Sequence, residues 1–234
     1  MFKQKLNFTN TKVLKLSAIF EGENRDAPIV VMCHGFASSK DAFSTRSLAQ
    51  KLVKGRLSVF RFDFTGCGQS EGGINDLTPL QGLDDLKCAA KNLEKTKVAL
   101  YGSSFGGYIA LLYALKNPVL ALALKAPVSD YLWVAKNTEP SLRRKSWARE
   151  VMNIDIYKEA RKIKMPIIIV HGDNDRIVPI DQSRRLLRSI EIGDLIIIKG
   201  AVHKMRGEDL EKANTLIADF FEKTLTSRVR RRFT

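Results

Sequence analysis

The pentapeptide Gly102-Ser103-Ser104-Phe105-Gly106 constrains the fold of this chain more than any other segment. An apolar run at 98–101 precedes it, and a helix-like run at 108–115 follows it. Gly-x-Ser-x-Gly between a strand and a helix is typical of a sharp turn that exposes the central serine above a sheet. Side chains at the two flanking glycine positions would collide with the strand or the helix. The alternative is an ordinary serine and glycine loop that only turns the chain.

The three histidines of the chain also follow apolar, strand-like runs. His34 follows residues 28–33, His171 follows 167–170, and His203 comes shortly after 194–198. Open parallel sheets build their sites beyond the carboxyl ends of their strands. We therefore expect the three histidines to lie at the same end of one sheet.

Strand-like and helix-like segments alternate along the chain. Strands are predicted at 5–8, 12–20, 28–33, 58–64, 97–101, 119–124, 166–170 and 194–198. Helices are predicted at 42–54, 79–93, 106–116, 181–190 and 208–225. The first two strands predict an antiparallel start, and the repeated strand–helix units that follow favour an α/β fold. Its sheet would be mostly parallel, with helices on both faces.

One long segment interrupts this alternation. The stretch between the strands predicted at 119–124 and 166–170 is longer than a parallel crossover requires. It contains both tryptophans of the chain, Trp133 and Trp147. We expect a small cap insertion at about 127–165, with the two tryptophans as substrate-binding residues. The alternative is a pair of ordinary crossover helices whose aromatic residues pack on the sheet.

The length and the residue content limit what the chain can be. Its 234 residues fit one domain, 1–234, with a basic tail at about 227–234. No apolar run is long enough for a membrane span, and the first residues lack the apolar core of a signal peptide. The sequence therefore predicts a cytoplasmic protein. Cys33, Cys67 and Cys88 match neither a zinc pattern nor a disulfide framework, so we expect reduced thiols.

The net charge of +14 raises the question of a nucleic-acid or anionic-membrane partner. The basic residues are spread along the chain, with denser clusters at 143–145 and 228–232. No nucleic-acid-binding motif accompanies them, and no aromatic residues interleave them as they do in a groove for single strands. We therefore expect solvated basic surfaces and no specific nucleic-acid partner.

Several segments together resemble the α/β-hydrolase superfamily of serine hydrolases. They are His34-Gly35-Phe36, Arg61-Phe62-Asp63-Phe64-Thr65-Gly66-Cys67-Gly68-Gln69-Ser70, the pentapeptide around Ser104, His171-Gly172-Asp173-Asn174-Asp175-Arg176-Ile177-Val178-Pro179, and Gly200-Ala201-Val202-His203. Within this superfamily, the sequence resembles cinnamoyl (feruloyl) esterase-like carboxylesterases and serine aminopeptidase-like and monoglyceride lipase-like hydrolases. Serine, aspartate and histidine also occur in the order that this superfamily uses.

The resemblance implies a role for each member of a catalytic triad. Ser104 would be the nucleophile, His203 the general base, and Asp175 the acid that orients the base. Asp173 is the alternative acid. His171 would orient the loop that carries the acid.

An oxyanion hole is implied as well. It would use the backbone amide of Phe105 and the backbone amide of Phe36, in the loop after an earlier strand. His34 would be a structural residue of that loop. Two positions depart from many relatives, since Ser103 and Cys67 each stand where histidine is common. Neither position belongs to the triad, but both weaken the assignment to any one subfamily.

The implied activity is that of a serine carboxylesterase acting on small or medium acyl or aryl esters through an acyl-enzyme intermediate. This chemistry needs neither a metal nor an organic cofactor. A thioesterase or monoglyceride lipase with the same residues is the alternative, and a peptidase or a non-catalytic binding protein has less support. The partner is a small-molecule ester. The acyl chain length, the alcohol and the oligomeric state, including a homodimer, stay open.

Overall fold

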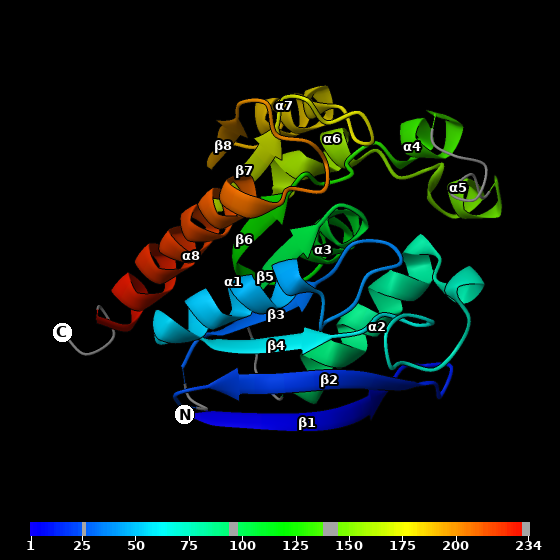
Figure 1. Ribbon diagram of the computed structural model, residues 1–234. Helices are drawn as coiled ribbons and strands as arrows, with labels where there is room; N and C mark the ends of the chain where they lie inside the picture. Colours follow the sequence, from blue (N-terminus) through cyan, green and yellow to red (C-terminus); the bar gives the residue numbers. More distant parts are fainter. Residues whose placement is uncertain (25–26, 94–97, 138–144, 231–234) are drawn as a thin grey trace.

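A central sheet of eight strands lies between helices on both faces (Figure 1). The computed structural model describes residues 1–24, 27–93, 98–137 and 145–230 of the chain. The strands are β1 (Phe2–Thr9), β2 (Lys15–Gly22), β3 (Ile29–Cys33), β4 (Ser58–Phe62), β5 (Val98–Ser103), β6 (Val119–Lys125), β7 (Ile167–Gly172) and β8 (Gly193–Ile198). The predicted α/β class is confirmed.

The order of the strands explains where a site can form. It is β1-β2-β4-β3-β5-β6-β7-β8, with β1 and β2 antiparallel as predicted and β3 to β8 parallel. After β3 the chain continues to β4 on one side, whereas after β5 it continues to β6 on the other side. Connections that diverge in this way leave a crevice beyond the carboxyl ends of the two strands, where ligands bind in open α/β sheets. The loops after β3 and β5 meet at this point.

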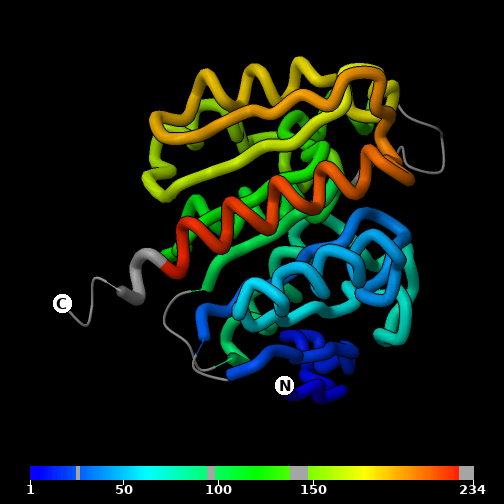
Figure 2. The backbone as a smooth tube through the Cα atoms, turned by 60° about the vertical axis from the view of Figure 1, so that its left-hand side comes forward, coloured from blue at the N-terminus to red at the C-terminus, as the bar shows by residue number. Residues whose placement is uncertain are grey.

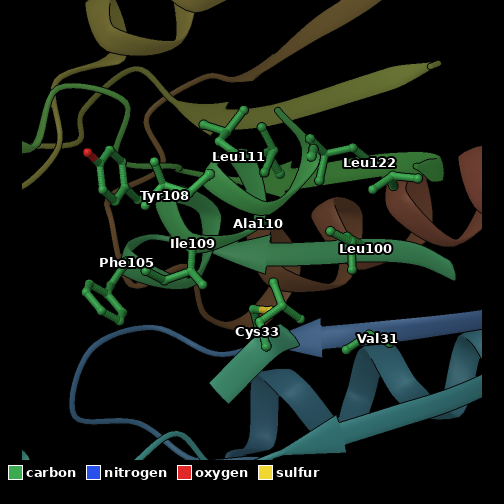
Figure 3. Packing of buried hydrophobic residues seen from close by; sticks show 14 of the residues in the cluster. Val31, Cys33, Leu100, Phe105, Tyr108, Ile109, Ala110, Leu111 and Leu122 are labelled. Carbon is green, nitrogen blue, oxygen red and sulfur yellow. The ribbon is translucent and has the colours of Figure 1, made fainter. Parts of the chain in front are cut away.

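Two apolar cores lie on the two faces of the sheet. Helices α1 (Phe43–Lys54) and α8 (Gly207–Arg230) cover one face, and α2 (Pro79–Asn92), α3 (Phe105–Ala114) and α7 (Ile180–Arg188) cover the other. Figure 2 shows α8 lying beside α1 across the first face. Successive β3 side chains point to opposite faces. Val30 and Met32 therefore pack with α1 and α8, whereas Val31 and Cys33 pack with α3 (Figure 3).

The segment predicted as an insertion, 127–165, lies between β6 and β7. It contains α4 (Tyr131–Asn137), α5 (Lys145–Val151), α6 (Ile156–Glu159) and a 3₁₀ turn, η2 (Ala160–Lys162). Residues 138–144 of this segment lie outside the described residues. α5 packs against α2, and the Leu80 N–H in the first turn of α2 donates to Glu150 Oε2 at 3.3 Å. In Figure 1, α4 and α5 stand together beyond the carboxyl ends of the strands.

Several element boundaries differ from the sequence prediction. The last helix begins at Gly207 and continues to Arg230, so residues 227–230 of the predicted basic tail are helical. This stretch contains neither glycine nor proline, and nothing in it stops a helix. Residues 231–234 of the tail lie outside the described residues. A short 3₁₀ turn, η1 (Ile74–Asp76), was not predicted.

Within residues 1–24, 27–93, 98–137 and 145–230, no helix is both long enough and apolar enough to cross a membrane.

Candidate active site

Ser104 occupies a strained turn between β5 and α3. Its φ of 53° and ψ of −117° are unfavourable for a residue with a Cβ atom, and such strain concentrates at functional sites. A Cβ on Gly102 would collide with the backbone of Gly106, and a Cβ on Gly106 would collide with the Cys33 carbonyl. The two glycines thus let α3 pack directly over β5 and against the end of β3. This is the conformation that the pentapeptide predicts.

The hydroxyl of Ser104 begins a chain of hydrogen bonds that joins three loops. Ser104 Oγ lies 2.9 Å from His203 Nε2, and His203 Nδ1 lies 2.6 Å from Asp175 Oδ2. Asp175 follows β7, and His203 lies between β8 and α8. Because a carboxylate can only accept, Nδ1 of the ring donates to it, and Nε2 is left to accept the proton of the serine hydroxyl. The structure therefore brings together the three residues that the sequence predicts as nucleophile, base and acid.

Asp175 is held as a carboxylate by its surroundings. Its side chain is fully buried, and burial by itself raises the pKa of this group. Hydrogen bonds from His171 and His203 outweigh that effect and hold the pKa of Asp175 well below its usual value. The backbone N–H groups of Ile177 and Val178 also donate to Oδ1, both at 2.9 Å. The carboxylate therefore stays charged beside His203.

The alternative acid, Asp173, lies elsewhere. Asp173 is exposed, and its Oδ1 accepts a hydrogen bond from the Gly200 N–H at 2.5 Å. Asp173 thus closes the loop after β8 and leaves Asp175 as the carboxylate in contact with His203. Position in the sequence alone does not separate the two aspartates, since they are only two residues apart.

The two remaining histidines are buried. His171 lies within β7, not after it as predicted, because β7 continues to Gly172. His34 follows β3, where its Nδ1 contacts the Gly35 carbonyl at 2.7 Å and its Nε2 accepts the Phe64 N–H at 3.1 Å. Burial lowers the pKa of His34, which favours the neutral ring. His34 therefore links the loop after β3 to the segment after β4.

The loop after β3 lies against the serine turn. A Cβ on Gly35 would be 3.5 Å from Ser104 Cβ, and the rings of Phe36 and Phe105 meet edge to face at 6.0 Å. The Phe105 N–H is the first of α3, where no intrahelical acceptor exists. The Phe36 N–H donates to no backbone carbonyl in the part of the chain that the structure describes. Phe105 thus follows Ser104 directly, and Phe36 lies next to Gly35, which approaches Ser104, with its ring against that of Phe105.

A buried ionic network, which sequence reasoning missed, ties this loop to the end of β4. Lys40 Nζ contacts Asp63 Oδ2 at 2.7 Å, and the Lys40 backbone N–H donates to Asp63 Oδ1 at 2.6 Å. Arg61 donates to the Lys40 carbonyl at 2.6 Å and to Asp41 at 2.8 Å. The Lys40, Arg61 and Asp63 side chains are at most 2% exposed. Asp63 belongs to the segment 61–70, which is one of those that resemble the α/β-hydrolase superfamily. No other feature of the sequence indicates this ionic network.

The two predicted substrate-binding tryptophans differ in their surroundings. Trp147 of α5 is 3% exposed, and its ring meets the Phe36 ring edge to face at 5.4 Å. Trp133 of α4 is half-buried, its N–H donates to Asp130 Oδ1 just before the helix, and its carbonyl accepts from the Asn137 side-chain amide. The insertion thus reaches the loop after β3 through Trp147.

A cavity of about 320 Å³ lies between α3, the insertion and α7. Its lining includes Tyr108, Ser129, Tyr157 and Arg185. Tyr108 comes one helical turn after Ser104, and Figure 3 shows its ring among the buried residues on α3. Ser129 Oγ lies 3.1 Å from the Tyr157 hydroxyl, and the Arg185 guanidinium stacks 4.0 Å over the Tyr157 ring. The cavity therefore offers aromatic faces and polar groups, and it shares α3 with the serine turn, although neither Ser104 nor His203 lines it.

Other chemistry has less support from the described residues. Their His, Cys, Asp and Glu side chains form no group of three or more suited to a metal ion. All three cysteines are free. Burial raises the pKa of Cys67 to about 11 and raises that of Cys33 further, which disfavours a thiolate at either position.

Profiles of two known protein families match this chain. A profile of the alpha/beta hydrolase fold matches residues 28–141, and a profile described as serine aminopeptidase, S33, matches residues 143–209. The two matches follow one another along the chain and cover the serine turn, Asp175 and His203. The chain belongs to the α/β-hydrolase superfamily. Its eight-stranded, mostly parallel sheet is the fold of this superfamily.

Curated relatives of this α/β hydrolase are identical to it at about a quarter of the aligned residues. It is 24% identical to the AB hydrolase superfamily protein YisY of Bacillus subtilis, over 82% of this chain and 90% of that protein. It is 25% identical to the human mitochondrial palmitoyl-protein thioesterase ABHD10, over 86% of this chain and 75% of that protein. It is 29% identical to human protein ABHD12B, but the alignment spans only 51% of that longer protein.

A solved structure with bound ferulic acid has the same fold as this α/β hydrolase. The structure of Est1E from Butyrivibrio proteoclasticus with bound ferulic acid superposes with a TM-score of 0.85. The superposition covers 94% of this chain and 99% of Est1E, at 20% sequence identity. A palmitoyl-protein thioesterase is thus among the relatives in sequence, and Est1E shares the fold.

Proposed function

We propose that this α/β hydrolase is a serine carboxylesterase that acts on small or medium acyl or aryl esters. The observation that carries the proposal is the continuous hydrogen-bonded chain from Ser104 Oγ through His203 to the buried Asp175 carboxylate. A serine hydroxyl is a weak nucleophile by itself, and it needs an oriented base to take its proton. The strained turn, with its hydroxyl 2.9 Å from the base, fits that requirement.

The reaction follows two steps of acyl transfer. Ser104 Oγ attacks the ester carbonyl carbon while His203 Nε2 takes the hydroxyl proton. The negative charge that forms on the carbonyl oxygen faces the N–H groups of Phe36 and Phe105 and the N-terminal end of α3. His203 then returns its proton to the leaving alcohol, and the acyl group stays on Ser104. Water, deprotonated by His203, attacks the acyl-enzyme and releases the acid.

The proposed substrate class draws on the cavity and on the relatives. We assign the acyl or aryl group to the cavity of about 320 Å³ that begins at Tyr108, one turn of α3 after Ser104, and a volume near the lower end of the range for small-molecule pockets fits small or medium substrates. The Tyr108 and Tyr157 rings suit an aryl group, and Est1E binds ferulic acid, an aromatic acid. The second candidate is thioester hydrolysis, which the similarity to ABHD10 favours and which uses the same residues.

Hydrolysis of p-nitrophenyl esters from acetyl to palmitoyl, with an acyl-thioester in parallel, tests the proposal. Wild type is expected to peak at short or medium chains. Ser104→Ala is expected to lower kcat by about 10⁴-fold or more. Ser103→Ala is the matched control, because it removes the neighbouring hydroxyl from the same turn and leaves the base and its acid in place.

Three outcomes would change the proposed function. Equal activity of wild type and Ser104→Ala would overturn the role of the serine. Faster turnover of the thioester than of every oxygen ester would move the assignment to a thioesterase. A peak at palmitoyl would move it to a lipase.

A further inference from the structure

Asp175 has two imidazole partners, and the reaction above uses only one. Its Oδ2 lies 2.6 Å from His203 Nδ1 and 3.1 Å from His171 Nε2. We propose that His171 is a positioning residue, which donates to Asp175 Oδ2 and thereby sets both the orientation and the basicity of His203. This inference rests on the proposed function and assigns it one further residue.

The hydrogen bonds around His171 determine which ring nitrogen carries the proton. Nε2 faces two acceptors, the Asp175 carboxylate at 3.1 Å and the Val178 carbonyl at 3.0 Å, so Nε2 donates. Nδ1 lies 2.7 Å from Ser183 Oγ, and in the neutral ring it accepts the hydroxyl proton. His171 and Ser183 are both fully buried. β7 and α7 thus hold one tautomer of the ring against the loop that carries Asp175.

A second donor on the same carboxylate oxygen weakens the attraction between the Asp175 carboxylate and the His203 proton. An N–H bond to Oδ2 withdraws electron density from the oxygen that His203 uses, so the carboxylate pulls less strongly on the His203 proton. The titratable groups in contact with Asp175 are His171 from β7 and His203 from the loop before α8. The far nitrogen of His203 contacts the Ser104 hydroxyl. Without the donor from His171, His203 is expected to bind its proton more tightly and to be a less effective base near neutral pH.

Two conservative substitutions separate this role from packing. In His171→Gln, the amide nitrogen is as many bonds from Cβ as Nε2 is, so it can still donate to Asp175. In His171→Asn, the amide reaches only as far as Nδ1, so it keeps the contact with Ser183 and loses the contact with Asp175. Both substitutions remove the ring, and both therefore share any loss that arises from packing alone.

The kinetic test measures kcat, KM and kcat/KM for p-nitrophenyl acetate between pH 4 and pH 9. In His171→Asn we expect kcat to fall by about 10-fold to 100-fold, with little change in KM. Loss of the hydrogen-bond partner that orients a metal-binding histidine has an effect of this size in other proteins. We also expect the acid limb of kcat/KM to move to higher pH by about 0.5 unit or more. His171→Gln is expected to retain the wild-type acid limb and most of the wild-type kcat. Equal losses in the two variants with an unmoved acid limb would overturn the proposal and leave His171 a packing residue.

Titration of the imidazole protons by NMR separates a failure of this inference from a failure of the proposed function. The chain has three histidines, so His171→Asn leaves only the imidazole signals of His34 and His203, and burial lowers the pKa of His34. A His203 midpoint at higher pH in His171→Asn than in wild type, with His171→Gln close to wild type, supports the inference even if no ester is turned over. Identical His203 midpoints in all three proteins overturn it even if the enzyme is a fast esterase.

Discussion

At the scale of single residues, Asp175 illustrates how local contacts decide the chemistry of a side chain. Its carboxylate is buried, a condition that alone would favour the neutral acid. Two imidazoles and two backbone N–H groups reverse that preference and keep the group charged. Asp173, two residues earlier, is exposed and contacts the Gly200 N–H instead. The two aspartates therefore provide a matched pair for a test of the acid.

Asp175→Asn is expected to lower kcat by about 10⁴-fold, because the amide N–H faces His203 Nδ1 and forces the wrong tautomer on the ring. Asp173→Asn, the control, is expected to keep kcat near the wild-type value. Steady-state kinetics on a short p-nitrophenyl ester measure both. A larger loss in Asp173→Asn than in Asp175→Asn would show that the acid is assigned to the wrong residue.

The low pKa of Asp175 also predicts how the free energy of unfolding depends on pH. The pKa of Asp175 is lower in the folded protein than in the unfolded chain, so the charged carboxylate stabilises the fold above the unfolded pKa of about 3.9. That contribution is lost as the pH falls through the lower, folded pKa. The part of the difference in unfolding free energy between wild type and Asp175→Asn that comes from the carboxylate charge is therefore expected to shrink as the pH falls below the unfolded pKa. Urea denaturation at several pH values measures it.

At the scale of elements, a buried ion pair connects the loop after β3 to the segment after β4. Lys40 and Asp63 are separated by 23 residues in the chain, and neither side chain is more than 2% exposed. A buried ion pair adds little net stability, because the loss of hydration offsets the attraction of the charges. What the pair does supply is a fixed geometry for the loop that carries Phe36.

Lys40→Met is expected to lower the free energy of unfolding by about 3–5 kcal/mol, because it leaves the Asp63 charge buried without the Lys40 ammonium group. Lys3→Met is the matched control, since the Lys3–Glu21 pair lies at the exposed end of the same network, with Lys3 60% exposed. The control is expected to cost less than about 1 kcal/mol. Urea denaturation of both variants checks the difference. Equal costs would mean that burial of Lys40 does not determine its contribution.

Sequence reasoning predicted local features of the site better than distant ones. The serine turn follows from two glycines and a strand–helix boundary, all within one pentapeptide. The pairing of Lys40 with Asp63 depends on which loops the sheet order brings together, and a lysine in a loop normally predicts an exposed side chain. The Ser183 contact with His171 was missed for the same reason, because a serine in a predicted helix carries no signal of its distant partner.

At the scale of the whole molecule, the insertion contacts the body of the protein next to the candidate site. Trp147 of α5 meets Phe36, and Phe36 in turn meets Phe105 at the start of α3. The Glu150 contact with α2 adds a second connection. These aromatic rings link the insertion to both loops that carry the proposed oxyanion-hole amides. The position of α5 therefore bears on the space available to an acyl group.

Trp147→Ala is expected to move the ester preference toward longer acyl chains, because removal of the indole opens space beside Phe36. It is also expected to lower the free energy of unfolding by about 3–5 kcal/mol, the usual cost of truncating a buried tryptophan. Trp133→Ala is the control, because Trp133 is only half-buried and lies on the other helix of the insertion. The p-nitrophenyl ester series and urea denaturation, run on both variants, measure the two effects. A chain-length profile that keeps the wild-type shape in Trp147→Ala, despite the loss of stability, would show that the tryptophan anchors the insertion without bounding the acyl site. A shifted profile in Trp133→Ala alone would instead transfer the role to α4.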